Sequence, residues 1–205
     1  SRGDREQEIL EAGAELLDQG GLQALTMDAV ARGTALSKGG IYRYFPNRDA
    51  LALALFERAF HTEAAFAEAE VMNWDLPLDE VLLRLMLREY TTVQERRFHR
   101  IWLQLLPLTL LRDEFREAKR RLEELYLARY RGLVVALVRR EGWSVSATFL
   151  ASVDISLRLA STLMEGMTYR QMSGVTREEI EPQFRRFIQV MLHDAQRMNQ
   201  DPATV

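Results

Sequence analysis

The amino-acid sequence predicts an all-α fold. Long stretches of the 205 residues repeat apolar side chains at helical spacing, and no segment shows the alternation of apolar and polar residues typical of a half-buried strand. Only 5 prolines and 11 glycines interrupt these stretches. Apolar residues make up 47% of the chain, which is enough for a folded core. We expect about nine helices, three short ones followed by a bundle of longer ones.

Three short helices are predicted near the N-terminus. The first covers about residues 5–19 and ends at a pair of glycines. The second begins at Thr26, whose hydroxyl can cap a helix, and runs to about Gly33. The third begins at a second capping residue, Ser37, and ends at Phe45, before a proline. Two short helices joined by a turn of about three residues have the geometry of a helix-turn-helix.

The rest of the chain predicts longer helices. A fourth helix is expected from Arg48 to about Glu70. Further helices are expected over about residues 78–94, 97–111 with a kink at Pro107, 113–141 and 144–172.

The last helix ends near Met198, and the sequence leaves its start open. Thr176 and Glu179 form a possible capping box, but that start places Pro182 inside the helix. A start near Glu181 places the proline in the first turn, where it is tolerated.

The charge of the chain is unevenly distributed. The formal net charge is -3 and the pI is near 5.7, which by itself argues against a nucleic-acid-binding protein. Residues 32–48, however, contain Arg32, Lys38, Arg43 and Arg48 and no acidic residue, whereas the first helix carries several carboxylates. Positive charge is therefore concentrated on the segment that contains the third helix.

The sequence lacks the motifs of several other classes of protein. There is no cysteine for a disulfide or a thiolate metal site, and no phosphate-binding loop or hydrolase motif. No glutamate precedes any of the three histidines at the di-iron spacing. No apolar run approaches about 18 residues, so no membrane span is expected. We expect a cytoplasmic protein that is not an enzyme and needs no metal or cofactor.

The third helix has an inward and an outward face. Ile41 and Phe45 are four residues apart and share the inward face. Lys38, Gly39, Tyr42 and Arg43 lie toward the other face, with Tyr44 at its edge. Cations, phenol hydroxyls and a helix N-terminus all bind phosphate oxygens, and lysine or arginine can also read guanine. The glycines at 39 and 40 either permit close approach to a surface such as DNA or only ease a tight turn.

These residues carry a resemblance to a known family. The run LTMDAVA at residues 25–31 and the run LSKGGIYRYFPNR at residues 36–48 are similar to the DNA-binding domain of the TetR (tetracycline-repressor) family of bacterial transcriptional regulators. The upstream ILEAG at 9–13 and the downstream Leu51 also fit, so the resemblance covers about residues 5–60. The remainder matches only in its helical layout.

The resemblance implies a set of DNA contacts. They fall on Thr26, Ser37, Lys38, Gly39, Gly40, Tyr42, Arg43, Tyr44 and Arg48. Thr26 and Tyr42 would touch phosphates, and Arg43 and Tyr44 would face the groove. Arg48 stands where the family usually has a phosphate-binding lysine. One departure is Ala35, where a turn glycine is usual. Alanine disfavours positive φ, and Gly33 could supply the missing flexibility.

The resemblance also implies two domains and a dimer. Residues 1–47 would form the helix-turn-helix domain, and residues 48–205 a ligand-sensing and dimerisation domain, connected by the helix at about 48–70. Two apolar sets at helical spacing near the C-terminus suggest two buried faces; the alternative is that they form only an intramolecular core. The predicted dimer interface consists of Phe149, Val153, Leu157, Ala160, Met164, Phe184, Phe187, Ile188 and Met191.

An effector site is expected among the C-terminal helices, as the resemblance implies. Aromatic and polar residues that could line an apolar pocket are Tyr90, His99, Trp102, Tyr126, Tyr130, Glu165 and Met167. Each could equally be an ordinary core or surface residue. The expected effector is an unknown small molecule, largely apolar.

The sequence thus favours a ligand-responsive repressor. As a dimer it would bind palindromic operator DNA and be released by an effector. The alternative is a helical sensor or adaptor without DNA binding, for which the acidic net charge leaves room.

Overall fold

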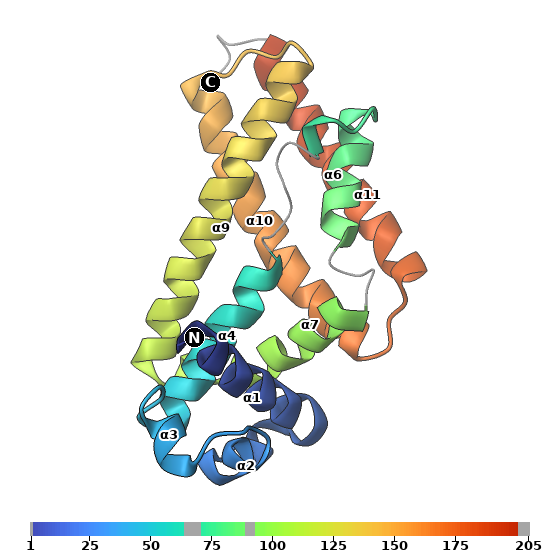
Figure 1. Ribbon diagram of the computed structural model, residues 1–205. Coiled ribbons are helices and arrows are strands. Elements are labelled where there is room, and N and C mark those ends of the chain that lie inside the picture. Colours follow the sequence, from blue (N-terminus) through green and yellow to red (C-terminus); the bar gives the residue numbers. More distant parts are fainter. Residues whose placement is uncertain (1, 64–70, 89–92, 201–205) are drawn as a thin grey trace. The chain divides into compact units, whose positions relative to one another are not determined.

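The computed structural model describes residues 2–63, 71–88 and 93–200, and every regular element in these ranges is a helix (Figure 1). The all-α prediction is therefore confirmed. The helices belong to two compact units, residues 1–64 with 93–122 and residues 65–92 with 123–205. The predicted division at residue 47 separates the chain by function rather than by packing, and it stays a prediction.

The first unit, unit 1, contains six of the described helices. They are α1 (Arg2–Ala24), α2 (Met27–Arg32), α3 (Lys38–Tyr42), α4 (Arg48–Glu63), α7 (Val93–Leu105) and α8 (Leu108–Leu111). The second unit, unit 2, contains α6 (Leu78–Arg88), α10 (Ala147–Met172) and α11 (Arg177–Gln200). Helix α9 (Asp113–Arg140) begins in unit 1 and continues in unit 2.

Some helix boundaries depart from the sequence-based expectation. The range of α1 extends to Ala24, but Gly21 is non-helical (φ +69°), so the first helix breaks at the predicted glycine pair and a short second segment follows. The helix expected at 97–111 is divided at Pro107 into α7 and α8. α11 begins at Arg177, so the start near Glu181 is wrong.

The start of α11 is fixed by its capping box. The backbone N–H of Thr176 donates to the carboxylate of Glu179 at 2.8 Å, and Pro182 lies inside the helix.

An aromatic cluster forms the centre of unit 1. Phe56 of α4 is fully buried and stacks on Trp102 of α7, with ring centroids 4.3 Å apart and planes at 14°. Phe115, at the start of α9, meets Phe56 edge-on at 5.7 Å. The same core takes in Ile9 of α1 and Ile41 of α3, both without exposed surface. The helices around the predicted helix-turn-helix are thus held by one continuous core.

Ion pairs join the outer surfaces of α1, α4 and α7 in unit 1. Glu11 of α1 accepts hydrogen bonds from Arg58 of α4 at 3.0 Å and Arg97 of α7 at 2.6 Å. Burial alone would raise the pKa of Glu11, but the bonds from Arg97 and Arg58 outweigh it and hold that pKa below its ordinary value. Asp18, two turns further along α1, pairs with Arg100 at 2.7 Å. These contacts fix α1 against α4 and α7.

Candidate nucleic-acid interface and ligand cavity

The two short helices of the predicted helix-turn-helix are capped as the sequence predicts. The hydroxyl of Thr26 accepts the backbone N–H of Ala29 at 3.1 Å, and the hydroxyl of Ser37 accepts that of Gly40 at 3.2 Å. Ile41, fully buried, anchors α3 to the core of unit 1. The opposite face of α3 is therefore held outward.

The outward face of α3 is open to solvent. Lys38, Gly39, Tyr42 and Arg43 are exposed, and Tyr44 is half-buried at its edge. A Cβ atom at Gly39 would meet nothing within 4 Å. A Cβ atom at Gly40 would lie 3.4 Å from the Ser37 hydroxyl oxygen, which is an ordinary van der Waals distance. Nothing within the described part of the chain requires a glycine at 39.

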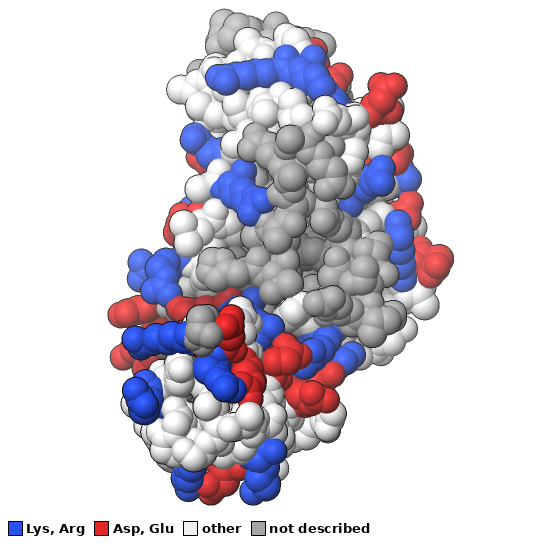
Figure 2. All heavy atoms as spheres, viewed as in Figure 1, with Lys and Arg blue, Asp and Glu red and all other residues white. Residues whose placement is uncertain are grey.

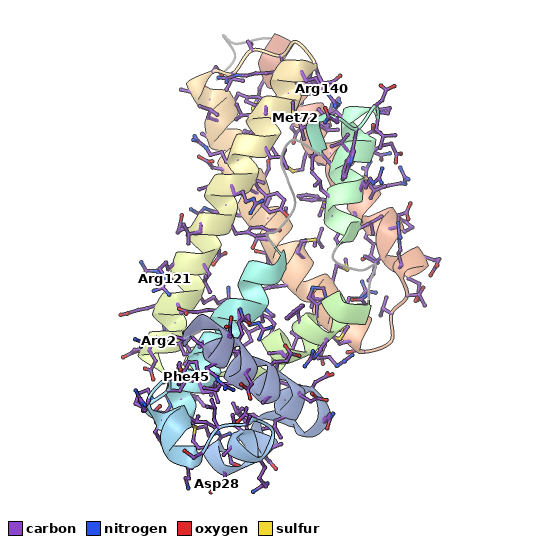
Figure 3. All side chains as sticks on the ribbon, viewed as in Figure 1. Arg2, Asp28, Phe45, Met72, Arg121 and Arg140 are labelled. Atoms are coloured by element: carbon purple, nitrogen blue, oxygen red, sulfur yellow. The ribbon has the colours of Figure 1, made fainter. Side chains whose placement is uncertain are left out.

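Lys38 is paired with a carboxylate from α2. Its ammonium lies 2.6 Å from the carboxylate of Asp28, and both side chains are more than half exposed. This hydrogen bond is the main cause that raises the pKa of Lys38. Asp28 lies at the edge of α2 in Figure 3, and Figure 2 shows basic and acidic side chains together in that region. The positive charge predicted for this segment is therefore partly offset by a neighbour in space.

Arg48 braces the start of α4. Its guanidinium donates to the backbone carbonyl of Leu22 in the last turn of α1. Asn47 caps the helix, its side-chain oxygen accepting the backbone N–H of Ala50 at 2.8 Å. Arg48 is exposed, so it can still reach a phosphate near the N-terminus of α4.

The turn before α3 is held by Glu8, a residue that the sequence did not single out. The carboxylate of Glu8 accepts the backbone N–H of Ala35 at 2.7 Å across 27 residues of sequence. No described residue other than glycine has a positive φ, and Gly33 has φ -86°, so this turn needs no glycine conformation at either position. The departure at Ala35 is therefore accommodated by a bond from α1.

The Glu8 contact predicts an acid-sensitive turn. The Ala35 N–H, and then the Arg5 guanidinium at 2.8 Å, lower the pKa of Glu8. A carboxylate with a lowered folded-state pKa contributes stability above its unfolded pKa, and that contribution is lost as the pH falls through the folded value. In thermal unfolding, Glu8→Gln should melt below the wild type at neutral pH, and the two should converge at acid pH. Glu6→Gln, on the exposed side of α1, is the control; a gap independent of pH would contradict the assignment.

Unit 2 contains an apolar cavity of about 130 Å³. Its walls come from α6, α9, α10 and α11 and from Trp143 in the connection before α10. Among the residues predicted for an effector site, Tyr126 and Tyr130 line this cavity.

The other predicted effector-site residues lie elsewhere. Trp102 and His99 are buried in unit 1 and so do not belong to this cavity. Met167 is buried in a neighbouring cluster of unit 2, Glu165 is half-buried on α10 outside the lining, and Tyr90 lies outside the described residues. No described cluster of three or more His, Asp or Glu side chains could hold a metal ion.

The residues predicted for the dimer interface point into their own chain. All of them except Phe184 line the cavity, and Phe184 is fully buried in the adjacent cluster. The opposite face of α10 carries Ile155, Leu159 and Tyr169, which are 62%, 51% and 64% exposed. Val190 of α11 is 42% exposed as well. The same two helices thus present a second apolar surface to the outside.

α10 is long and apolar enough to cross a membrane by length and composition, and 17% of its most apolar 18-residue window is buried in this chain. One such helix is weak evidence for a membrane span, because a helix in the core of a soluble protein can pass the same test.

The capped pair α2 and α3, with a buried inward face and an open outward face, defines a helix-turn-helix protein. A profile described as "Bacterial regulatory proteins, tetR family" matches residues 9–55, which contain this pair. Over these residues the chain is therefore similar to the TetR family of bacterial regulators.

Individual relatives agree with this assignment. The nucleoid occlusion factor SlmA of Haemophilus ducreyi is 34% identical over 67 residues, which are 32% of this chain and a third (33%) of that relative's length. A protein from Rhodococcus sp. described as a TetR-family regulator has the same fold, with a TM-score of 0.72, 20% identity and coverage of 92% of this chain and 98% of its own.

A third relative was solved with a small molecule. The structure of a transcriptional regulator from Saccharomonospora viridis in complex with choline matches with a TM-score of 0.69 and 18% identity, over 93% of this chain and 96% of that one.

Proposed function

We propose that this chain is a ligand-responsive transcriptional repressor that binds a palindromic operator as a dimer and leaves it when a small molecule enters unit 2. The observation that carries the proposal is the outward face of α3. No atom of the described residues would lie within 4 Å of a Cβ at Gly39, and this glycine is flanked by Lys38, Tyr42 and Arg43, which can bind phosphates or base edges. A bare backbone at that position lets the start of α3 approach DNA closely.

The proposed DNA contacts divide into two kinds. The hydroxyls of Thr26 and Tyr42 and the guanidinium of Arg48 are suited to phosphates, which fix the register of the protein on the duplex. Arg43 and Tyr44 are suited to the groove, where arginine recognises guanine. The hydroxyl oxygens of Thr26 and Ser37 accept the cap bonds, so their O–H groups can still donate to a phosphate oxygen.

Selection of bound duplexes from random DNA tests DNA binding directly. The expected result is an enriched palindrome whose affinity falls steeply with salt, because each phosphate contact releases counterions. An adaptor without DNA binding would enrich no sequence and show no such dependence. The selected operator is then the probe for every affinity measurement below.

Replacing Asp28 should strengthen DNA binding. Asp28 holds Lys38 at 2.6 Å and places a negative charge on the proposed interface. Asp28→Asn frees the lysine for a phosphate, so we expect operator affinity to rise about fivefold and the slope against log salt to steepen by about 0.9. The melting temperature should fall slightly, because an acid in the first turn of a helix is favourable. Fluorescence anisotropy and thermal unfolding measure the two effects.

Asp113→Asn is the matched control for that variant. Asp113 also lies in the first turn of a helix and pairs with an arginine, Arg116 at 2.7 Å, but it lies outside α2 and α3. It should lower stability in the same way and leave operator affinity unchanged. Equal affinities for Asp28→Asn and wild type would show that the ion pair does not compete with DNA.

We place the proposed dimer interface on the exposed apolar face of α10 and α11. This face is exposed among the described residues, whereas the side chains first predicted for the interface line the cavity or are buried beside it. Leu159→Arg introduces a charge that a second copy would have to bury, so sedimentation velocity should show monomers. Leu125→Arg, at an equally exposed leucine of α9, should leave the dimer intact. A dimer that survives Leu159→Arg has its interface elsewhere.

Release by a ligand requires that the ligand bind one conformation better than the other. The relative solved with choline supports a small-molecule site in a protein of this fold. In this chain the proposed site is the cavity of unit 2, and α4 is the proposed connection to α3. Operator affinity measured with and without bound ligand tests the switch, and equal values for every bound ligand would exclude it.

A further inference from the structure

The cavity of unit 2 restricts the size of its occupant. Its volume is about 130 Å³. An engineered apolar cavity of about 150 Å³ in another protein holds one benzene molecule. An occupant of this cavity in its present form is therefore a single ring or a short alkyl chain rather than an extended lipid or a drug-sized molecule.

The lining of the cavity carries no formal charge. Among the described residues that form it, none is Asp, Glu, Lys, Arg or His. Its polar groups are hydroxyls and an indole, from Tyr126, Tyr130, Trp143, Ser156 and Ser161. The Ser156 hydroxyl donates to the backbone carbonyl of Ser152 at 2.7 Å, so its oxygen is left to accept a hydrogen bond. The site can therefore satisfy a hydroxyl on the ligand, but it offers no counter-ion.

One side of the cavity is aromatic. The rings of Tyr126 and Tyr130, one turn apart on α9, have centroids 4.3 Å apart, and Trp143 meets Phe149 edge-on at 6.4 Å. Such faces pack well against another ring. They also attract cations, but a cation that loses its water here would have no carboxylate among the described lining residues.

We propose that the cavity selects a small uncharged ligand with an apolar ring or chain and a single hydroxyl, a substituted phenol being the simplest example. This inference rests on the proposed function, since it names the class of effector. A carboxylate or an ammonium of the same shape is rejected because burial removes its hydration and the lining does not replace it.

Calorimetric titration of the full-length protein without DNA tests the ligand class. The probes are 4-methylphenol, benzoate and benzylammonium at neutral pH, which have the size of one substituted ring and differ in charge. We expect the phenol to bind about 100-fold more tightly than either ion. The proposal is overturned if either ion binds within about threefold of the phenol, or if the phenol does not bind at millimolar concentration.

Two variants tie the binding to this cavity. Ala160 lines it, so Ala160→Phe should fill the space and remove phenol binding; Ala128→Phe, on the exposed side of α9, should not. Ser161→Asp places a carboxylate in the lining and should shift the preference toward the benzylammonium probe by at least about tenfold. Phenol binding that is unaffected by Ala160→Phe overturns the assignment to this cavity.

Operator measurements separate this inference from the proposed function. If the phenol binds as expected but operator affinity does not change, the ligand class stands and release by the ligand fails. If a charged probe binds instead and releases the operator, the proposed function stands and the ligand class is wrong.

Discussion

Gly39→Leu is expected to reduce operator affinity by about 100-fold or more, the equivalent of about 2.7 kcal/mol, while leaving the protein at least as stable as the wild type. A leucine here is a better helix former than glycine by about 1 kcal/mol, and its Cβ meets no other atom of the described chain within 4 Å. The side chain would stand between α3 and DNA. It would hold the helix away from the groove and lengthen several phosphate contacts at once.

Gly132→Leu is the matched control for this prediction. Gly132 lies on the exposed side of α9, where an added Cβ also meets nothing within 4 Å. It should gain the same stability and keep full operator affinity. Anisotropy with the selected operator and thermal unfolding by circular dichroism give the two readings. If Gly39→Leu binds the operator with wild-type affinity, the proposed DNA interface at the start of α3 is wrong.

The features that the sequence predicted correctly depend on residues close in the chain. A capping hydroxyl acts on an N–H three residues later, so Thr26 and Ser37 could be assigned from their neighbours alone. A proline in a helix interior removes a backbone hydrogen bond, and Pro107 separates α7 from α8, although Pro182 is tolerated inside α11. Local chemistry of this kind is visible in one sequence.

The features that the sequence could not predict join residues far apart in the chain. Nothing in the spacing of Glu8 and Ala35 shows that one will hold the other's N–H. Charge counted along residues 32–48 omits Asp28, which reaches Lys38 from the preceding helix. A local reading therefore overestimates the free positive charge of the interface.

Helical periodicity could not show what each apolar face of α10 packs against. It identifies which side chains share a face, but not whether that face meets its own chain or a second copy. Phe149 and Val153 have the pattern expected of an interface and lie inside the chain, whereas Leu159 is exposed. An aromatic side chain is likewise expected to be buried, but the sequence does not show in which cluster. Trp102 was therefore expected in the effector site, whereas it lies in the core of unit 1.

Phe56→Ala should lower the free energy of unfolding of unit 1 by about 3–5 kcal/mol. Phe56 is fully buried, stacks on Trp102 at 4.3 Å and meets Phe115 at 5.7 Å, so its loss leaves a cavity bordered by α4, α7 and the start of α9. Trp102 belongs to unit 1, whereas Trp74 and Trp143 belong to unit 2. Fluorescence of a variant that keeps only Trp102 therefore follows the unfolding of unit 1 in urea.

Phe56→Leu retains much of the side-chain volume but not the ring stacking, so it should lower the free energy of unfolding of unit 1 by less, about 1.5 kcal/mol. The Phe56 variants also test whether the core of unit 1 affects operator binding. Because the same core holds α3 through Ile41 and α4 through Phe56, loosening it should weaken operator binding even though neither residue faces DNA. A Phe56→Ala protein that unfolds within about 1 kcal/mol of the wild type would show that this core does not hold the DNA-reading helix in place.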